Sequence, residues 1–223
     1  MSNQFAPFGL QPVRRLDGAA WSDQLTTMLI GSGNAHSFFR GDLIAILSTG
    51  YIDRLAGSSS FAQTYSGIGV FWGCELAATT SGSPWSQTYV ASSQPNNDCK
   101  AFIIMDPNVV FRCQAGSGAA PGSAGGPVTL SQVWQNAPVL NGTGNTSSGQ
   151  SGGYLDAANI AATATLPLQI VNLVGQTNTT ATASAGPLVG PPLGTNGTDL
   201  STAGNYVEVT LNQAIFKVGQ TGI

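Results

Sequence analysis

Short hydrophobic runs separated by turn residues recur along the chain, and their lengths and spacing favour β-strands over helices. Residues 43–47 (LIAIL) follow the turn residues Gly41 and Asp42 and are predicted to form a buried strand. In residues 67–76 (GIGVFWGCEL) large apolar residues alternate with glycines, whose missing side chains indicate bulging or a close approach of backbone. Residues 85–90 (WSQTYV) predict a further short strand.

The hydrophobic pattern is strongest in residues 99–113 (CKAFIIMDPNVVFRC). Residues 101–105 and 109–112 have a β-strand composition, and residues 106–108 (DPN) between them are typical of a turn, because proline fixes φ and an Asp side chain can accept from nearby amides. Both runs are apolar on both parities, which indicates that both of their faces are covered. We therefore predict a hairpin of two adjacent strands at the centre of a sandwich or barrel.

Two later segments alternate apolar and polar residues, as half-buried strands do. In residues 164–170 the apolar residues share one parity, and Pro167 on the polar parity predicts an edge strand. In residues 206–218 the apolar parity switches, which predicts a bulge near Asn212 and Gln213. The whole pattern predicts an all-β fold, an antiparallel β-sandwich or barrel of about eight strands.

The segments between these strands are rich in Gly, Ser and Thr. Such low-complexity tracts bury little apolar area, so we predict long loop insertions at about residues 114–153 and 176–204, with one short helix inside residues 127–140. Residues 1–20 mix Pro and Gly with isolated apolar residues, which predicts an extended N-terminal arm that lies on another surface; a flexible terminus is the alternative. Because 223 residues suffice for one large all-β domain, we assign residues 21–223 to a single β-rich domain.

Charge is unusually scarce. Charged residues make up only 8% of the chain, whereas about 25% is usual. Between residues 114 and 200 only Asp156 and Asp199 carry a charge, so uncharged polar groups and backbone must cover that region. Because free monomers normally rely on surface charge for solubility, this composition favours a protein that works while docked in an assembly.

Several partner classes fit the composition poorly. The net charge is −3, and no basic cluster exceeds the pair Arg14 and Arg15, so we expect no nucleic-acid partner. The longest apolar runs fall far short of the roughly 18 residues that span a bilayer, and the first residues do not resemble a secretory signal, so we expect no membrane association.

Signals for chemistry are weak. His36 is the sole histidine, and a G-x-S-x-G match at residues 149–153 lies in a low-complexity tract instead of a strand-to-helix elbow. Residues 96–99 (NNDC) lack EF-hand spacing, and the three cysteines fit no zinc template, which favours buried free thiols. We therefore predict no enzymatic activity, no cofactor and no metal site. A hydrolase built around His36 stays as an alternative.

Five segments carry a resemblance to a known group of proteins. They are FGLQPVRRLDGAAWSDQ, GVFWGCEL, KAFIIMDPNVVFRCQ, TATLPLQIVNLVG and YVEVTLNQAIF. Together, and in this order, they resemble tailed-bacteriophage virion proteins described as head decoration, cement or structural proteins. The resemblance implies a protein without an active site that docks on the outer surface of the phage head, assembled in the host cytoplasm, and stabilises contacts between major capsid protein subunits.

The partner expected from this resemblance is the major capsid protein. Symmetry-related binding then predicts a homo-dimer or homo-trimer on capsid symmetry axes. Tryptophans usually belong to a core, but Trp85 and Trp134 lie near loops and are candidate interface anchors. With the arm, the candidate interface residues are Phe5, Phe8, Arg14, Arg15, Trp85 and Trp134. The alternative is a receptor- or glycan-binding β module of the virion, which uses exposed Trp and Tyr against sugar rings.

Overall fold

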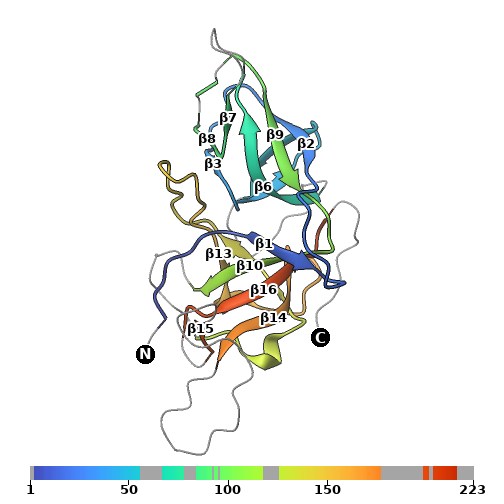
Figure 1. Ribbon diagram of the computed structural model, residues 1–223, viewed down its shortest axis with the longest axis vertical. Coiled ribbons are helices and arrows are strands. Elements are labelled where there is room, and N and C mark those ends of the chain that lie inside the picture. Colours follow the sequence, from blue (N-terminus) through green and yellow to red (C-terminus); the bar gives the residue numbers. More distant parts are fainter. Residues whose placement is uncertain are drawn as a thin grey trace, which may run out of the picture.

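The computed structural model describes residues 3–55, 67–77, 84–91, 93–94, 96–117, 126–176, 198–200 and 203–214. Its regular elements are β-strands and two single-turn 3-10 helices, which confirms the all-β prediction. Figure 1 shows two lobes stacked along the long axis. We name them the barrel lobe, built from β2 to β9, and the sheet lobe, built from β1 and β10 to β16.

The barrel lobe contains a closed ring of five strands, in the order β4-β5-β2-β9-β6, because β4 also pairs with β6. Each of these five strands therefore has a paired neighbour on both sides over at least part of its length. Such closure protects the ring from pairing with strands of other molecules. The two-residue strand β7 pairs antiparallel with the last residues of β6. The short strands β3 and β8 pair with each other beside the ring. The strands are β2 (Thr26–Ile30), β3 (Phe38–Phe39), β4 (Leu43–Ile46), β5 (Tyr51–Arg54), β6 (Gly67–Glu75), β7 (Trp85–Ser86), β8 (Thr88–Tyr89) and β9 (Cys99–Ile104).

The sheet lobe has the strand order β11-β14-β16-β10-β13-β12, and β1 and β15 pair with β10 and β14. Most pairs are antiparallel, while β10 with β13 and β14 with β15 are parallel. Its elements are β1 (Gln11–Arg15), β10 (Val109–Gly116), η1 (Leu130–Gln132), β11 (Asn136–Ala137), β12 (Val139–Leu140), β13 (Tyr154–Asp156), η2 (Ala157–Asn159), β14 (Leu168–Gln176), β15 (Thr198–Asp199) and β16 (Tyr206–Leu211).

The predicted hairpin at residues 99–113 is wrong, although both of its strands exist. β9 pairs with β2 and β6 in the barrel lobe, whereas β10 pairs with β1, β13 and β16 in the sheet lobe. The turn forms as expected, with the Asn108 amide donating to Asp106 Oδ1 at 2.9 Å. It carries the chain from one lobe to the other, because β1 and β16 occupy the two edges of β10.

Three further expectations need correction. Pro167 does not mark an edge strand, because β14 begins one residue later and lies between β11 and β16. The predicted short helix at residues 127–140 is only the single 3-10 turn η1. The described residues from 126 to 153, predicted as part of a loop insertion, also contain β11 and β12. The parity switch after β16 falls largely outside the described residues.

The buried apolar residues that the structure describes form two clusters. The larger one joins the lobes, because Val70 and Ile104 of the barrel lobe belong to the same cluster as Phe111 and Val209 of the sheet lobe. The smaller one fills the barrel lobe around Phe71. The prediction of a single β-rich domain after the arm stays a prediction, and the shared cluster is compatible with it.

The expectation of buried free thiols is confirmed for all three cysteines, Cys74, Cys99 and Cys113. Burial raises the pKa of the Cys74 and Cys113 thiols to about 12. Both groups are therefore uncharged near neutral pH and act as small apolar side chains in the core.

Candidate functional site

The part of the sheet lobe built by residues 126–176 has an uncharged exterior. Asp156, the one charged residue of this segment, is only 3% exposed. Its carboxylate is used internally, because it accepts from the Ala158 amide at 3.1 Å and from Asn159 Nδ2 at 2.6 Å. Residues 126–176 therefore present almost no charged side-chain surface to solvent.

Two large apolar side chains project from this uncharged exterior. Leu130 in η1 is 79% exposed, and Trp134, two residues after η1, is 46% exposed. We call this pair and the turn between them the Leu130–Trp134 surface. Leu130 belongs to η1, the short yellow-green coil below β14 in Figure 1, on the side of the sheet lobe away from the barrel lobe. The structure therefore leaves Trp134 available as the anchor that the sequence suggested.

Trp134 is held in an unfavourable backbone conformation. Its φ is 71°, in the left-handed region that glycine favours, while its amide donates to Ile170 O at 2.7 Å. A left-handed conformation costs an ordinary L-residue roughly 1–2 kcal/mol. Such strain is typically retained at binding or catalytic positions, where the surrounding structure compensates for it.

Trp85 is the other predicted anchor that is exposed. It is 52% exposed in β7, on the barrel lobe. A Cβ atom added at Gly73 would lie 2.6 Å from Cζ2 of the indole, so the ring rests on the backbone of β6 at that glycine. The alternation of glycine with apolar residues in β6 was the sequence signal for this close approach.

The aromatic residues of the arm are used within the chain. The Phe5 ring meets Tyr154 edge to face at 5.1 Å between centroids, and the Phe8 ring meets Tyr206 in the same way at 5.3 Å. Both phenylalanines are half-buried. In this structure they attach the arm to its own sheet lobe.

The two arginines of the arm are also paired. Arg14 Nη2 lies 2.8 Å from Glu208 Oε2, and Arg15 Nη1 lies 2.6 Å from Asp106 Oδ2. The first pair joins β1 to β16, and the second joins β1 to the turn between the lobes. Of the six predicted interface residues, Trp85 and Trp134 are therefore those that present a large exposed apolar side chain.

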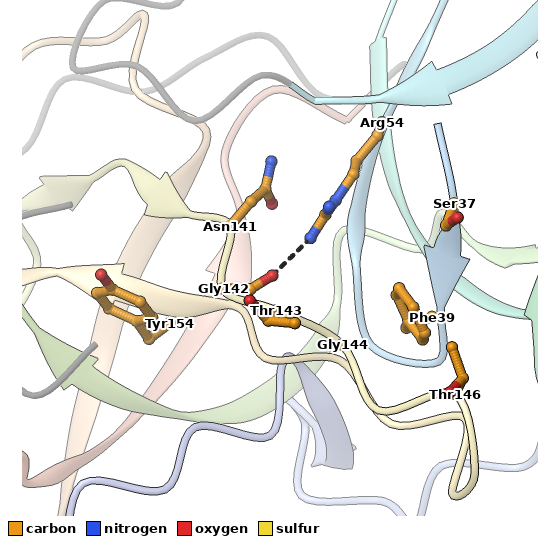
Figure 2. A pocket seen from close by; sticks show the side chains of 9 residues that line it. All are labelled: Ser37, Phe39, Arg54, Asn141, Gly142, Thr143, Gly144, Thr146 and Tyr154. Carbon is orange, nitrogen blue, oxygen red and sulfur yellow. Dashed lines mark hydrogen bonds between the residues drawn. The ribbon is translucent and has the colours of Figure 1, made fainter. Parts of the chain in front are cut away.

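A pocket of about 470 Å³, lined by both polar and apolar groups, lies between the lobes. Figure 2 shows Arg54 of β5 reaching toward the loop after β12, where its Nη2 donates to Gly142 O at 3.0 Å. The residues that line the pocket are Ser37, Phe39, Arg54, Asn141, Gly142, Thr143, Gly144, Thr146 and Tyr154. Sequence reasoning missed this site, because its residues come from four separate segments without a shared motif.

A buried carboxylate lies behind Arg54. Asp42 is 1% exposed, accepts from the Phe39 amide at 3.0 Å and from Ser151 Oγ at 2.5 Å, and has its Oδ2 3.5 Å from Arg54 Nε. Burial raises the pKa of Asp42, while Arg54 and the hydrogen bonds oppose that shift. This network ties the barrel lobe to residues 142–153 of the sheet lobe.

The candidate hydrolytic residues are not brought together by these contacts. Ser151, within the G-x-S-x-G match, is buried and donates to Asp42. His36 is exposed, and its Nδ1 lies 2.8 Å from Asp53 Oδ1. Within the described ranges no three His, Cys, Asp or Glu side chains are close enough to hold a metal ion together.

Comparisons with family models, with curated proteins and with solved structures find no match. Among the residues that the structure describes, no helix has the length and apolar character needed to cross a membrane.

Proposed function

We propose that this chain is a decoration or cement protein of a tailed-bacteriophage head, which docks on the outer capsid surface and stabilises contacts between major capsid protein subunits. The observation that carries the proposal is the Leu130–Trp134 surface, two exposed apolar side chains on an exterior without charge. Charged residues are depleted at the centres of protein interfaces, whereas tryptophan is enriched there. The resemblance of five sequence segments to head decoration proteins supports the same function.

The mechanism is mechanical. Apolar and backbone contacts of the Leu130–Trp134 surface with adjacent capsid subunits raise the free energy needed to separate them. Each contact is small, but a shell carries many copies, and their effects combine. A homo-dimer or homo-trimer on a capsid symmetry axis would place several such surfaces around one junction.

The test is the copy number of the protein in purified particles and the temperature at which particles release their DNA. We expect a copy number close to that of the major capsid protein, and a lower release temperature for particles that lack this protein. A handful of copies with an unchanged release temperature would contradict the proposal and favour the receptor-binding alternative.

A substitution separates attachment from folding. Trp134→Gly removes the anchor and suits the left-handed backbone, so the isolated variant should be at least as stable as the wild type. Loss of an anchor typically costs about 2 kcal/mol or more of binding free energy, which is roughly 30-fold in affinity. The variant should therefore be depleted from particles, whereas Trp85→Ala, a matched loss of an exposed tryptophan on the other lobe, should remain bound.

A further inference from the structure

The strand register gathers three side chains on the outer face of the barrel lobe. Glu75 of β6 pairs directly with Trp85 of β7 on one side and with Lys100 of β9 on the other. Directly paired residues of an antiparallel ladder project from the same face. Their neighbours Cys74 and Ala101 are buried on the opposite face. We call Trp85, Glu75 and Lys100 the Trp85 platform.

The indole of the platform rests on the backbone of β6. One part of the ring rests on the backbone at Gly73, where a Cβ atom would lie 2.6 Å from Cζ2 and 3.0 Å from Cε2. The strand that carries it is secured by the Leu76 amide, which donates to Pro84 O at 3.2 Å, and by Ser86 Oγ, which donates to Thr88 O at 2.7 Å. Because Trp85 is 52% exposed, part of the indole remains open to solvent beside this contact.

The polar groups beside the ring offer both kinds of hydrogen bond. Lys100 Nζ lies 3.3 Å from Glu75 Oε2, and the two side chains are 47% and 41% exposed. An ammonium supplies donors and a carboxylate supplies acceptors, and neither is used up by a single exposed ion pair. A ligand that lies on the indole would therefore meet a donor and an acceptor at its edge.

We propose that the Trp85 platform binds a carbohydrate, with one pyranose ring stacked on the indole. A pyranose has a face of C–H groups, which complements the negative face of an aromatic ring, and an edge of hydroxyls, which can both donate and accept. A protein partner fits less well, because charged residues are depleted at interface centres, and here the directly paired residue Glu75 and the next residue across the sheet, Lys100, are both charged. The preformed position of the ring lowers the entropic cost of binding.

This binding is separate from the proposed capsid docking. The platform is on the barrel lobe and the Leu130–Trp134 surface is on the sheet lobe, so the isolated full-length protein suffices for a test. The chain has four tryptophans, which give four indole N–H signals in a nitrogen-proton correlation spectrum. Probes are trisaccharides of glucose, N-acetylglucosamine, mannose and galactose, each titrated to about 50 mM, since single-ring contacts fall in the millimolar range.

We expect a saturable shift of the Trp85 indole signal with at least one trisaccharide, while the Trp134 signal stays in place. Trp85→Ala should abolish binding, and Trp85→Phe, which keeps an aromatic cover over Gly73, should retain it with about tenfold weaker affinity. Trp134→Ala is the matched control and should bind as the wild type does. Circular dichroism of each variant shows whether the fold is kept.

Three results would overturn the proposal. One is a Trp85 signal that none of the trisaccharides moves. A second is an equal shift of the Trp85 and Trp134 signals, which would indicate unspecific contact with sugar. The third is a Trp85 signal that changes with protein concentration alone, since a second copy of the chain would then cover the platform.

Discussion

Single residues join the arm and the two lobes, and Gly9 is one such position, where the arm meets both lobes. Its φ is 73°, its amide donates to Gly153 O at 3.0 Å, and the next amide donates to Gly41 O at 2.8 Å. A Cβ atom here would lie 2.6 Å from the Cβ of Ser151 and 2.7 Å from Gly41 O. No residue other than glycine fits this junction without displacing its neighbours.

We expect Gly9→Ala to lower the free energy of unfolding by roughly 2–5 kcal/mol, as backbone strain and overpacking add together. Gly18→Ala is the matched control, because Gly18 also has a positive φ, of 85°, but has no atom within 4 Å of the added Cβ position. It should cost only the backbone strain, roughly 1–2 kcal/mol. Urea unfolding measures the free energy of unfolding of both variants. Equal losses would contradict the expectation, because they would show that the neighbours of Gly9 move aside without an energetic penalty.

Asp42 should make stability depend on pH. Burial raises its pKa, so the folded carboxyl holds its proton more tightly than the unfolded one. The group therefore favours folding below its unfolded pKa, and this contribution is lost as the pH rises through the folded pKa. Asp42→Asn removes the titration, so the stability of the variant relative to the wild type should increase as the pH rises above about 4, the usual pKa of an Asp in an unfolded chain.

Urea unfolding of both proteins across this range measures the difference. Asp42→Asn also loses an acceptor for Ser151 or Arg54, so the sign of the difference at a single pH is not the test. The test is its slope with pH. A difference that stays constant across the range would contradict the assignment.

At the scale of elements, Glu208 joins three strands. Its carboxylate lies 2.8 Å from Arg14 of β1, 3.5 Å from Arg112 of β10, and accepts from Asn172 of β14 at 3.3 Å. The side chain is only 7% exposed. Loss of the carboxylate would leave Arg14 and Arg112 without this partner, and because their side chains are 36% and 30% exposed, water solvates part of their charge.

We expect Glu208→Gln to destabilise the protein by about 1.5–3 kcal/mol, the range for hydrogen bonds to charged groups. Glu75→Gln is the matched control, since the Glu75 and Lys100 pair is exposed, and it should cost about 0.2–1 kcal/mol. Thermal melts of the two variants give the comparison. Losses of the same size would contradict this expectation, because they would indicate that water solvates the charges around Glu208 to the same degree as those of a surface pair.

The elements also show how far the sequence could be interpreted. Hydrophobic runs located β4, β6, β9 and β10, because burial leaves a local pattern. Strand partners leave no such pattern, and for this reason β9 and β10 were wrongly joined as a hairpin. The exposed Trp85 and Trp134 could be selected from nearby turn residues, whereas Arg54 and Asp42 meet across the lobes only after folding. The sequence signals therefore reported burial well and long-range contacts poorly.

At the scale of the whole molecule, the distribution of charge makes a prediction about salt. Attachment through the Leu130–Trp134 surface involves no charged side chain of residues 126–176 at the contact. Raising the salt from about 0.1 M to about 1 M shortens the screening length from about 10 Å to about 3 Å, which weakens exposed ionic contacts and leaves apolar ones intact. The copy number on particles washed at the two concentrations should be equal. Release at high salt would instead favour docking through the exposed parts of Arg14 and Arg15.

The order of strands along the chain has a consequence for synthesis. β1 lies beside β10, with Arg15 opposite Val109, and every strand of the barrel ring falls in sequence between them. A ribosome therefore delivers the complete ring before β10, β14 and β16, so the barrel lobe can fold while the sheet lobe is unfinished. The arm and β1 emerge first, yet they must wait for β16 to supply Glu208. A nascent chain halted after β9 should thus carry one protease-resistant half, with its N-terminal arm still open to cleavage.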